Sequence, residues 1–384
     1  MKLSKTIALL LSCTLLLLTA GCGASPKPAP SAAPEATSTP AVTATPEPTA
    51  TPEPTPTATP EPMFTNPLTG EQTYTDYSQT RPVAIMVENN HWDDGMLIAQ
   101  GGLSQADIVY EMQVESITRN MFLFMDTDGL NNVFPIRSAR SYFVSAALSY
   151  DAIFAHCGKS GEGLEFADTM LVNYTDADDI EVHEGSCGFR QYDAPYFGAV
   201  HSMTTTGERL QDLFAQYGTR TTHRTDGYDY GLHFTEDAAP VNGEAAGSIH
   251  IVFPTNKITD FSYDAEKGGY TSTQWNSAYT DGNTGESVVF ENILVLYSPT
   301  STGIDEKNHS AIYTYDYQDA GYFFNGGYRS RIARPAVMEP RQRERAVPLL
   351  YLRRQRAAAR RRQNVYRVRL RVLRRGELFV TGMH

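Results

Sequence analysis

The chain has 384 residues, 41% of them hydrophobic, and a formal net charge of −12. This charge is unevenly divided. Residues 1–328 hold 15 Lys and Arg against 41 Asp and Glu, whereas residues 329–384 hold 17 Arg against 3 Glu. An acidic body argues against a nucleic-acid-binding protein, because contacts to phosphates need a basic face. We therefore expect no nucleic-acid partner for the body.

The first residues have the features of an export signal. Two lysines precede an apolar run from Ile7 to Leu18, and this run is too short to span a bilayer. The following Ala20-Gly21-Cys22 resembles the bacterial lipobox, in which the cysteine receives the lipid. We expect residues 1–22 to be a lipoprotein signal peptide, with Cys22 lipidated at the extracytoplasmic face of the cell membrane. An ordinary cleaved signal, in which Cys22 has no role, is the alternative.

A low-complexity segment follows the predicted anchor. Residues 23–62 consist largely of Pro, Thr, Ala and Glu, with almost nothing that could form a core. Such a composition favours a disordered, extended linker. At about 3.1 Å per residue in polyproline II geometry, it would reach on the order of 120 Å. The sequence therefore predicts a spacer that holds a folded body away from the membrane.

Residues 63–224 mix helical and strand patterns, and we expect them to form an N-terminal α/β domain. Its predicted elements are strands at Pro82–Val87, Ala106–Ser116 and Met121–Met125, a helix at Ala139–Tyr150 with Ser138 as N-cap, a strand at Ala152–His156, and a helix that starts with a capping box of Thr205 and Glu208.

Residues 225–328 have a different texture, with short β runs separated by Gly, Asp and Asn. The runs are Ile249–Phe253, Gly269–Gln274, Ser287–Tyr297 and Ala311–Tyr317. We expect a smaller β-rich C-terminal domain. The predicted fold class is thus α+β, a mixed α/β N-terminal domain followed by that β-rich domain.

The basic tail, residues 329–384, changes composition abruptly after Tyr328 and contains neither Lys nor Asp. We interpret it as sequence read in a shifted frame, which would leave the C-terminal domain incomplete and the tail disordered. The alternative is a polyanion-binding arm with a helix around Arg343–Arg362 and a strand at Val365–Val372.

Two cysteines, Cys157 and Cys187, remain in the mature body. In an exported protein they could form a disulfide, which would close a loop of about 30 residues and stabilise the fold by roughly 3 to 4 kcal/mol. Two buried free thiols are the second interpretation. A zinc site that adds His156 and His183 is the third, although His156 and Cys157 are adjacent and converge poorly on one ion.

Several motifs occur in one order that resembles a known family. They are Arg81–Asn89 (RPVAIMVEN), Gly102–Glu111 (GLSQADIVYE), Thr118-Arg119, Pro135–Arg140 (PIRSAR) and Asp151–His156 (DAIFAH). Together they resemble the YerB-like lipoprotein family, the DUF3048 domain family, over about residues 64–328. The resemblance implies a lipid-anchored extracytoplasmic protein with an α/β domain, a β-rich domain and no established activity. Ala194-Pro195 and His201-Ser202 match the family's Pro-His-Asn region only loosely, which argues against His201 as a site residue.

Arginines cluster around the predicted start of the first helix. Arg137 and Arg140 flank Ser138, where free backbone N–H groups favour an anion. With Arg119 on a neighbouring strand, three guanidiniums would form a pocket for a carboxylate or a phosphate. The alternative is a structural network in which these arginines pair with nearby carboxylates, namely Glu111, Glu115 and Asp107.

These observations favour a tethered binding or scaffolding protein whose ligand is an anionic cell-envelope molecule or a partner protein. The alternative is a peptidoglycan or glycan hydrolase that uses an acidic residue such as Glu111 with His156. Glu111 and Glu115 do not form a glycosidase pair, because on one strand they would lie about 13 Å apart, beyond the roughly 9.5 Å limit. We expect no cofactor and no metal. The candidate ligand-binding residues are Arg119, Arg137, Ser138, Arg140, Glu111, Glu115 and His156.

Overall fold

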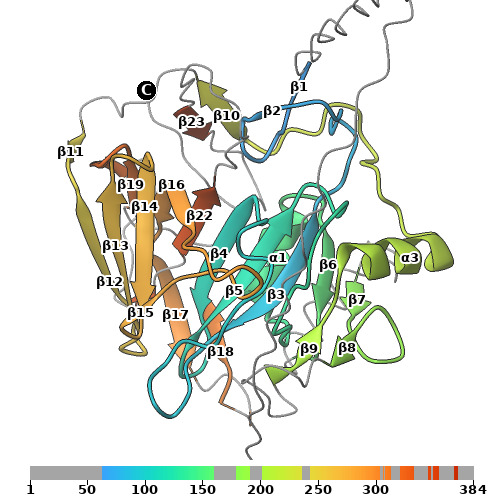
Figure 1. Ribbon diagram of the computed structural model, residues 1–384, viewed down its shortest axis with the longest axis horizontal. Coiled ribbons are helices and arrows are strands. Elements are labelled where there is room, and N and C mark those ends of the chain that lie inside the picture. The colour runs from blue at the N-terminus through green and yellow to red at the C-terminus, as the bar shows by residue number, and fades with distance from the viewer. Residues whose placement is uncertain are drawn as a thin grey trace, which may run out of the picture. The chain divides into compact units, whose positions relative to one another are not determined.

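The computed structural model describes residues 63–159, 179–190, 201–235, 243–302, 306, 308–312, 321–332, 345–346, 349–353 and 367–370. The predicted signal peptide and linker lie outside these residues. The described part of the chain is mostly strand, with two α-helices, α1 (Ser141–Leu148) and α3 (Gly207–Tyr217), as Figure 1 shows. Neither described helix is long and apolar enough to cross a membrane.

A mixed sheet forms the N-terminal half. Its strands, in spatial order, are β4 (Ile108–Gln113), β5 (Thr118–Phe124), β3 (Val83–Asn89), β6 (Ile153–His156) and β7 (Asp179–Glu181). The first three pair antiparallel, whereas β6 runs parallel to β3 and β7 runs parallel to β6. The carboxyl ends of β3, β6 and β7 therefore meet at one edge, where α/β sheets commonly carry their sites.

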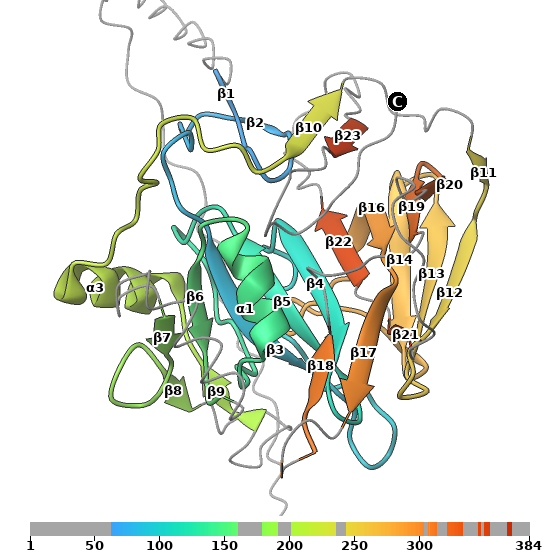
Figure 2. The same ribbon diagram turned by 180° about the vertical axis from the view of Figure 1, so that it is seen from behind.

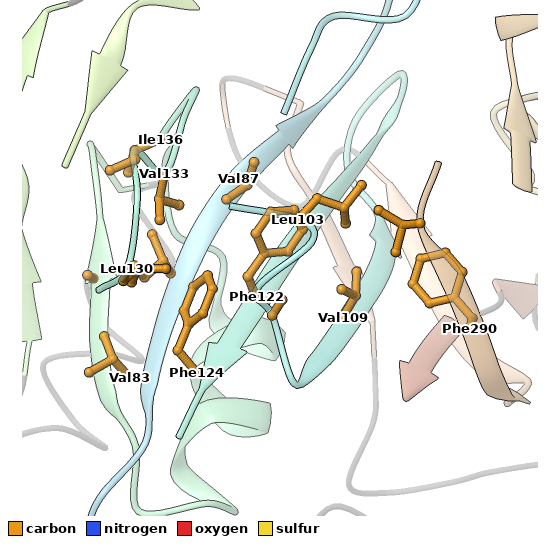
Figure 3. Close-up of a cluster of buried hydrophobic side chains, with 14 of the residues drawn as sticks. Val83, Val87, Leu103, Val109, Phe122, Phe124, Leu130, Val133, Ile136 and Phe290 are labelled. Carbon is orange, nitrogen blue, oxygen red and sulfur yellow. The ribbon is translucent and has the colours of Figure 1, made fainter. Parts of the chain in front are cut away.

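Both faces of this sheet are covered. Every residue of β3, β4 and β5 is buried, including the polar ones. On one face, Ala84, Met86 and Leu123 pack with α1 (Figure 2). On the other face, Val109 and Phe122 belong to the same hydrophobic cluster as Phe290 of the C-terminal half (Figure 3). A polar side chain on these strands must find a buried partner, because an unpaired one is costly.

The two helices begin later than the sequence predicted. The N-cap of α1 is Arg140, with no side-chain cap, rather than Ser138. Ala139 forms a parallel bridge with Lys159 and donates its N–H to the Gly158 carbonyl at 2.8 Å, so this residue is extended and cannot start the helix. The remainder of the helix covers the sheet as expected.

The capping residue of α3 is Thr206, not Thr205. Its side chain accepts a hydrogen bond from the Arg209 N–H at 3.3 Å. Thr205 instead bridges Val133 through its backbone, which removes it from the cap. Gly218 ends the helix with a φ of 63°, a left-handed conformation that glycine adopts without strain.

The C-terminal half is built from antiparallel strands. Its principal ones are β12 (Ser248–Val252), β13 (Ile258–Asp264), β14 (Gly269–Gln274), β16 (Val289–Val295), β19 (Gly321–Asn325) and β20 (Tyr328–Ile332), with short β11 (Glu244–Ala245) and β15 (Ser277–Ala278) beside them. The α+β prediction is confirmed, with a mixed sheet followed by an antiparallel, β-rich region. The predicted limits of the two domains stay predictions.

Short strands complete the described elements. They are β1 (Phe64–Thr65), β2 (Gln72–Thr73), β8 (Phe189–Arg190), β9 (Met203–Thr204), β10 (Leu232–Thr235), β17 (Ser298–Thr302) and β18 (Ser310–Ile312). The predicted run at Ala311–Tyr317 coincides with β18 only at its start, and its remainder lies outside the described residues.

The tail contributes strands where the structure describes it. These are β21 (Arg345–Ala346), β22 (Leu349–Arg353) and β23 (Arg367–Leu370). Strand β22 pairs antiparallel with both β16 and β4, so it links the two halves of the sheet (Figure 2). The alternative prediction of a helix around Arg343–Arg362 is wrong for the residues of β21 and β22, because these residues form strands. The strand considered at Val365–Val372 includes β23.

Candidate functional site

Two groups of polar residues occupy the same end of the N-terminal sheet, where β3 ends and β5 begins. Alternate residues of a strand point to opposite faces, so neighbours in sequence are separated by the sheet. Glu88 and Arg119 lie on the face that α1 covers, whereas Asn89 and Asn120 lie on the face toward the C-terminal half.

We call the first group the cationic cluster; it comprises the guanidiniums of Arg119, Arg137 and Arg140 with the carboxylates of Glu88 and Glu115. Arg119 is 6% exposed, and its Nη1 donates to the Ser138 carbonyl at 2.7 Å. Its Nε is buried and has no hydrogen-bond partner among the described residues. Burial, together with the charges of Arg140 and Arg137, lowers the pKa of Arg119 to about 9. The buried guanidinium of Arg119 thus lies near two other guanidiniums, those of Arg137 and Arg140.

Arg140 is held more conventionally. Its Nε and Nη2 donate to the two oxygens of Glu115, each at 2.9 Å, in a two-pronged pair. Its Nη1 donates to the Ala139 carbonyl at 2.9 Å. Burial acts to raise the pKa of Glu115, but the hydrogen bonds and charge of Arg140 outweigh it and hold the pKa below its usual value. This arginine therefore has a full structural role.

Glu88 connects the cluster to a histidine that the sequence had not singled out. This carboxylate is almost completely buried; its Oε2 lies 3.4 Å from Arg137 Nη1 and accepts from His201 Nδ1 at 2.6 Å. The His201 ring contacts the indole of Trp92 edge-on, with centroids 5.0 Å apart. Glu88 had a recognisable signal, a carboxylate at the end of an apolar strand, whereas the signal for His201 was only a loose match to the family's Pro-His-Asn region.

His156 is placed near this edge, at the end of β6, but it is fully engaged. Its Nε2 lies 2.7 Å from Asp179 Oδ1, and its Nδ1 lies 3.0 Å from the Gly158 carbonyl and 3.2 Å from Glu181 Oε2. Both ring nitrogens thus face acceptors, and the side chain is completely buried. This geometry suits a histidine that ties β6 to β7 better than a general base.

The second group lies on the opposite face of the sheet. We call it the Glu111 network; its members are Asn89, Gln100, Glu111, Asn120, Lys257 and Tyr279. Glu111 is 0% exposed and Lys257 of the C-terminal half is 4% exposed. The Lys257 ammonium donates to Glu111 and to the Thr259 hydroxyl. Burial lowers the pKa of Lys257 to about 8, although the Glu111 charge opposes this change.

Amide and hydroxyl groups extend this network. Glu111 Oε1 also accepts from Asn89 Nδ2 at 3.0 Å. Asn120 Nδ2 donates to Gln100 Oε1 at 2.8 Å and to the Tyr279 hydroxyl at 2.6 Å, and that hydroxyl donates to Gln100 at 2.9 Å. Lys257 and Tyr279 come from the C-terminal half, so the network joins the two halves of the molecule.

The structure divides the residues that the sequence had grouped. Arg119, Arg137, Ser138, Arg140 and Glu115 come together in or beside the cationic cluster. Glu111 does not join them, because it shares the face of its cross-strand neighbour Asn120, where Lys257 is its partner. The predicted pairing of these arginines with Glu111 is therefore wrong. For the same reason Glu111 and His156 are not brought together as a catalytic pair.

Asp107, the third carboxylate considered for the arginines, binds elsewhere. It accepts from Asn66 Nδ2 at 3.1 Å and from the Met125 N–H at 2.6 Å. It therefore anchors the loop between β1 and β2 and the residue that follows β5.

The cysteines are free thiols in the structure, which corrects the disulfide expectation and agrees with the second interpretation. Cys187 is buried in the hydrophobic cluster of the sheet, and Cys157 packs against that cluster. Burial raises the pKa of both thiols. His183 and Cys187 lie in a turn rather than on a helix, and no zinc-binding group of His156, Cys157, His183 and Cys187 is formed within the described ranges.

The two halves of the chain match two family models. Residues 68–220 match the DUF3048 N-terminal domain and residues 249–333 match the DUF3048 C-terminal domain, both described as domains of a protein of unknown function. The chain belongs to the DUF3048 family, which confirms the resemblance seen in its motifs. The C-terminal match ends five residues beyond Tyr328, where the composition changes.

A relative and a solved structure are both named YerB. The Bacillus subtilis protein named "Putative lipoprotein YerB" is 31% identical over 234 residues, which are 60% of this chain and 66% of that protein. The crystal structure of YerB from Bacillus subtilis superposes with a TM-score of 0.56 at 24% identity, covering 70% of this chain and 86% of that one. This likeness supports the fold.

Proposed function

We propose that the protein is a lipoprotein, anchored through Cys22 at the extracytoplasmic face of the membrane, that binds an anionic cell-envelope ligand at the cationic cluster. The lipobox-like Ala20-Gly21-Cys22 and the name of the Bacillus subtilis relative support the anchor. The extended composition of residues 23–62 supports a tether that gives the folded body reach. A binding or scaffolding role, rather than catalysis, is the activity we favour.

One observation carries the ligand class, the environment of Arg119. Among the described residues this guanidinium has a carbonyl partner and no carboxylate at ion-pair distance, although it is almost completely buried. The Glu115 charge acts to raise the pKa of Arg119, but burial and the charges of Arg140 and Arg137 outweigh it, so this buried charge is only partly compensated and is costly. A carboxylate or phosphate of a ligand would supply that countercharge and would accept from the unpartnered Nε.

The neighbouring arginines fit the same role. Arg137 is partly exposed, with 21% of its side chain accessible, so it can contact a ligand from solvent. The cluster brings three guanidiniums together with two carboxylates, and an anion would balance the excess charge. Because the guanidinium fork matches carboxylate and phosphate oxygens in pairs, the site favours such groups over a simple halide.

Titration calorimetry of the full chain with pyrophosphate and with citrate tests this function. We expect saturable binding that weakens at least tenfold in Arg137→Ala, with an unchanged melting temperature. Arg209→Ala, which removes the same charge from the exposed surface of α3, should bind as the parent does. Binding that survives Arg137→Ala, or that is lost equally in Arg209→Ala, contradicts a defined anion site.

A hydrolase is the second candidate, and the Glu88–His201 pair favours it. In the neutral tautomer that donates from Nδ1 to Glu88, Nε2 of His201 keeps its lone pair, which is the arrangement of a histidine that takes a proton from water. Release of soluble fragments from purified peptidoglycan, with a bell-shaped pH profile lost in Glu88→Gln, would support this activity. Saturable binding without turnover would support the binding protein.

A further inference from the structure

One carboxylate oxygen at the edge of the N-terminal sheet, Oε2 of Glu88, is shared between a histidine and an arginine. It lies 2.6 Å from His201 Nδ1 and 3.4 Å from Arg137 Nη1. Arg137 belongs to the cationic cluster and is partly open to solvent, whereas His201 lies outside the cluster. The two side chains therefore draw on the same negative charge, and a change in the charge of one of them alters what is left for the other.

The shared carboxylate is more deeply buried than either of its partners. Glu88 is 1% exposed, whereas 19% of the His201 side chain and 21% of the Arg137 side chain are accessible. Solvent and salt screen buried charges less than exposed ones, so the coupling through this carboxylate is strong. Water still reaches the histidine, which can therefore exchange protons with it. The arrangement thus links an ionisable ring near the surface to the charge of the cationic cluster.

The groups around His201 come from several elements. The shared carboxylate is on β3, and the Trp92 indole, with its centroid 5.0 Å away, is in the loop after β3. Arg137, from the segment before α1, contacts the same carboxylate, and Arg190 of β8 donates to the hydroxyl of the adjacent Ser202 at 3.2 Å. The carboxylate favours a protonated ring, and the two arginines oppose it. Histidine is the side chain whose charge ordinarily changes between about pH 5 and 8.

The charge at the cationic cluster depends on the protonation of this ring. The three guanidiniums and two carboxylates of the cluster leave one net positive charge when the imidazole is neutral. A second proton on the ring adds a cation that compensates Glu88, so Arg137 has less of that carboxylate's charge to itself. The net positive charge beside the site then rises by one. An anion at Arg137 is attracted more strongly as a result.

We propose that protonation of His201 strengthens anion binding at the cationic cluster, so that the protein binds its ligand more tightly in acidic surroundings. This regulation rests on the anion-binding function proposed above. One proton from solvent is added at Nε2, while Nδ1 keeps its hydrogen bond to Glu88. His201 does not touch the anion; it acts through Glu88 on Arg137. Because the coupling is reciprocal, a bound anion also favours the protonated ring.

Titration calorimetry of the full chain with pyrophosphate at pH 5.5 and at pH 7.5 tests the proposal. Pyrophosphate itself gains protons at the lower pH, so each variant is compared with the parent chain at both values. The ratio of the Kd at pH 7.5 to the Kd at pH 5.5 should be about fivefold larger in the parent than in His201→Asn. Asparagine offers a neutral N–H donor to Glu88 and takes no second proton. Equal ratios in the two proteins, or a larger ratio in the variant, overturn the proposal.

His250→Asn is the matched control. His250 Nδ1 lies 2.6 Å from Asp260 Oδ1, so this histidine also pairs with a carboxylate, but the pair is exposed on β12 and β13 of the C-terminal half. The variant loses the same titrating group at a distance from the cluster and should keep the ratio of the parent. A fall in the ratio equal to that of His201→Asn would assign the pH response to the overall charge of the protein and would overturn the proposal.

Glu88→Gln tests the coupling by a second route. Without the shared carboxylate, Arg137 keeps its full charge at either pH, so the variant should bind pyrophosphate more tightly than the parent at pH 7.5. Its ratio of Kd values should fall toward that of His201→Asn. Unchanged or weaker binding at pH 7.5 by this variant, with the melting temperature of the parent, contradicts a role for Glu88 as the link.

The anion site and its regulation fail in different ways. If the parent chain binds no pyrophosphate at either pH, the anion site is lost and the regulation with it. If the parent binds pyrophosphate, and binding is weakened by Arg137→Ala but its pH ratio does not depend on His201, the anion site stands and the regulation alone is overturned.

Discussion

The two faces of the N-terminal sheet treat buried charge in opposite ways. Arg119 and Asn120 are consecutive, as are Glu88 and Asn89, yet each pair is divided between the cationic cluster and the Glu111 network. In the Glu111 network, the Lys257 ammonium meets a carboxylate, a threonine hydroxyl and surrounding amides. In the cationic cluster, Arg119 donates to a carbonyl, and the charges of Arg140 and Arg137 together with burial outweigh that of Glu115.

This difference in the pairing of buried charge indicates a different role for each face. A buried ion pair that is fully hydrogen-bonded resists the removal of either member, because the remaining charge would be stranded. The Glu111 network therefore suits the attachment of the C-terminal half to the sheet. A buried cation without a countercharge gains from an added anion. The cationic cluster therefore suits reversible binding of an anionic ligand.

The largest expected effect is on the Glu111 side. Lys257→Met removes the ammonium and leaves Glu111 buried without its partner, which should cost about 3 to 5 kcal/mol in the free energy of unfolding. Chemical denaturation of the full chain measures this loss. Lys257→Met combined with Glu111→Gln should recover much of it, because no stranded charge remains.

Lys267→Met is the matched control for that experiment. Lys267 lies in the exposed turn after β13 and pairs with Asp264 at 3.5 Å. Such a surface pair contributes little, so the variant should stay within about 0.5 kcal/mol of the parent. A loss in Lys257→Met as small as that of Lys267→Met would remove the contrast between the two faces.

A smaller effect is expected in the pH dependence of stability. The pKa of Lys257 is about 8 in the folded protein against an ordinary 10.5, so between these values the unfolded chain binds more protons than the folded one. Stability must then rise with pH across this window. The whole gain in stability across this window should be on the order of 3 kcal/mol, and it is complete above pH 10.5.

Denaturation at pH 7.5 and 9.5 measures this contribution. The parent chain should gain stability relative to Lys257→Met between the two pH values, since that variant lacks the titrating group. Subtraction is needed because the pKa of Arg119 is also lowered and acts in the same direction at higher pH. An identical pH profile in both proteins would mean that Lys257 keeps its ordinary pKa.

The local sequence pattern was sufficient to predict many of the strands. The apolar runs predicted β3, β5 and β6 within a few residues, and Gly269–Gln274 was predicted with the bounds of β14. The spacing of Arg119, Arg137 and Arg140 also predicted a cluster that the structure brings together. In each case the signal lies in neighbouring residues, through periodicity or a shared turn.

The sequence predictions that were wrong or missing share one physical cause, which is pairing between segments that are distant in the sequence. Glu111 pairs with Lys257, which lies 146 residues away in the sequence. The periodicity of neither segment predicts this partner. Ala139 is withdrawn from the helix by its bridge to Lys159, and His201 reaches Glu88 across 113 residues. Sequence pattern shows that a polar residue lies on a buried strand, but the partner is decided by tertiary packing.

Of the buried cations, Arg119 should affect stability least, although it is about as buried as Lys257. Arg119→Met keeps the apolar stem and removes a charge that has no carboxylate partner among the described residues. The lost hydrogen bond to the Ser138 carbonyl should be offset by the relief of burial and of repulsion from Arg137 and Arg140. The free energy of unfolding should therefore change by less than about 1 kcal/mol, while binding of pyrophosphate is lost. A loss above about 3 kcal/mol with binding intact would give Arg119 the same structural role as Lys257, and the two faces would no longer differ.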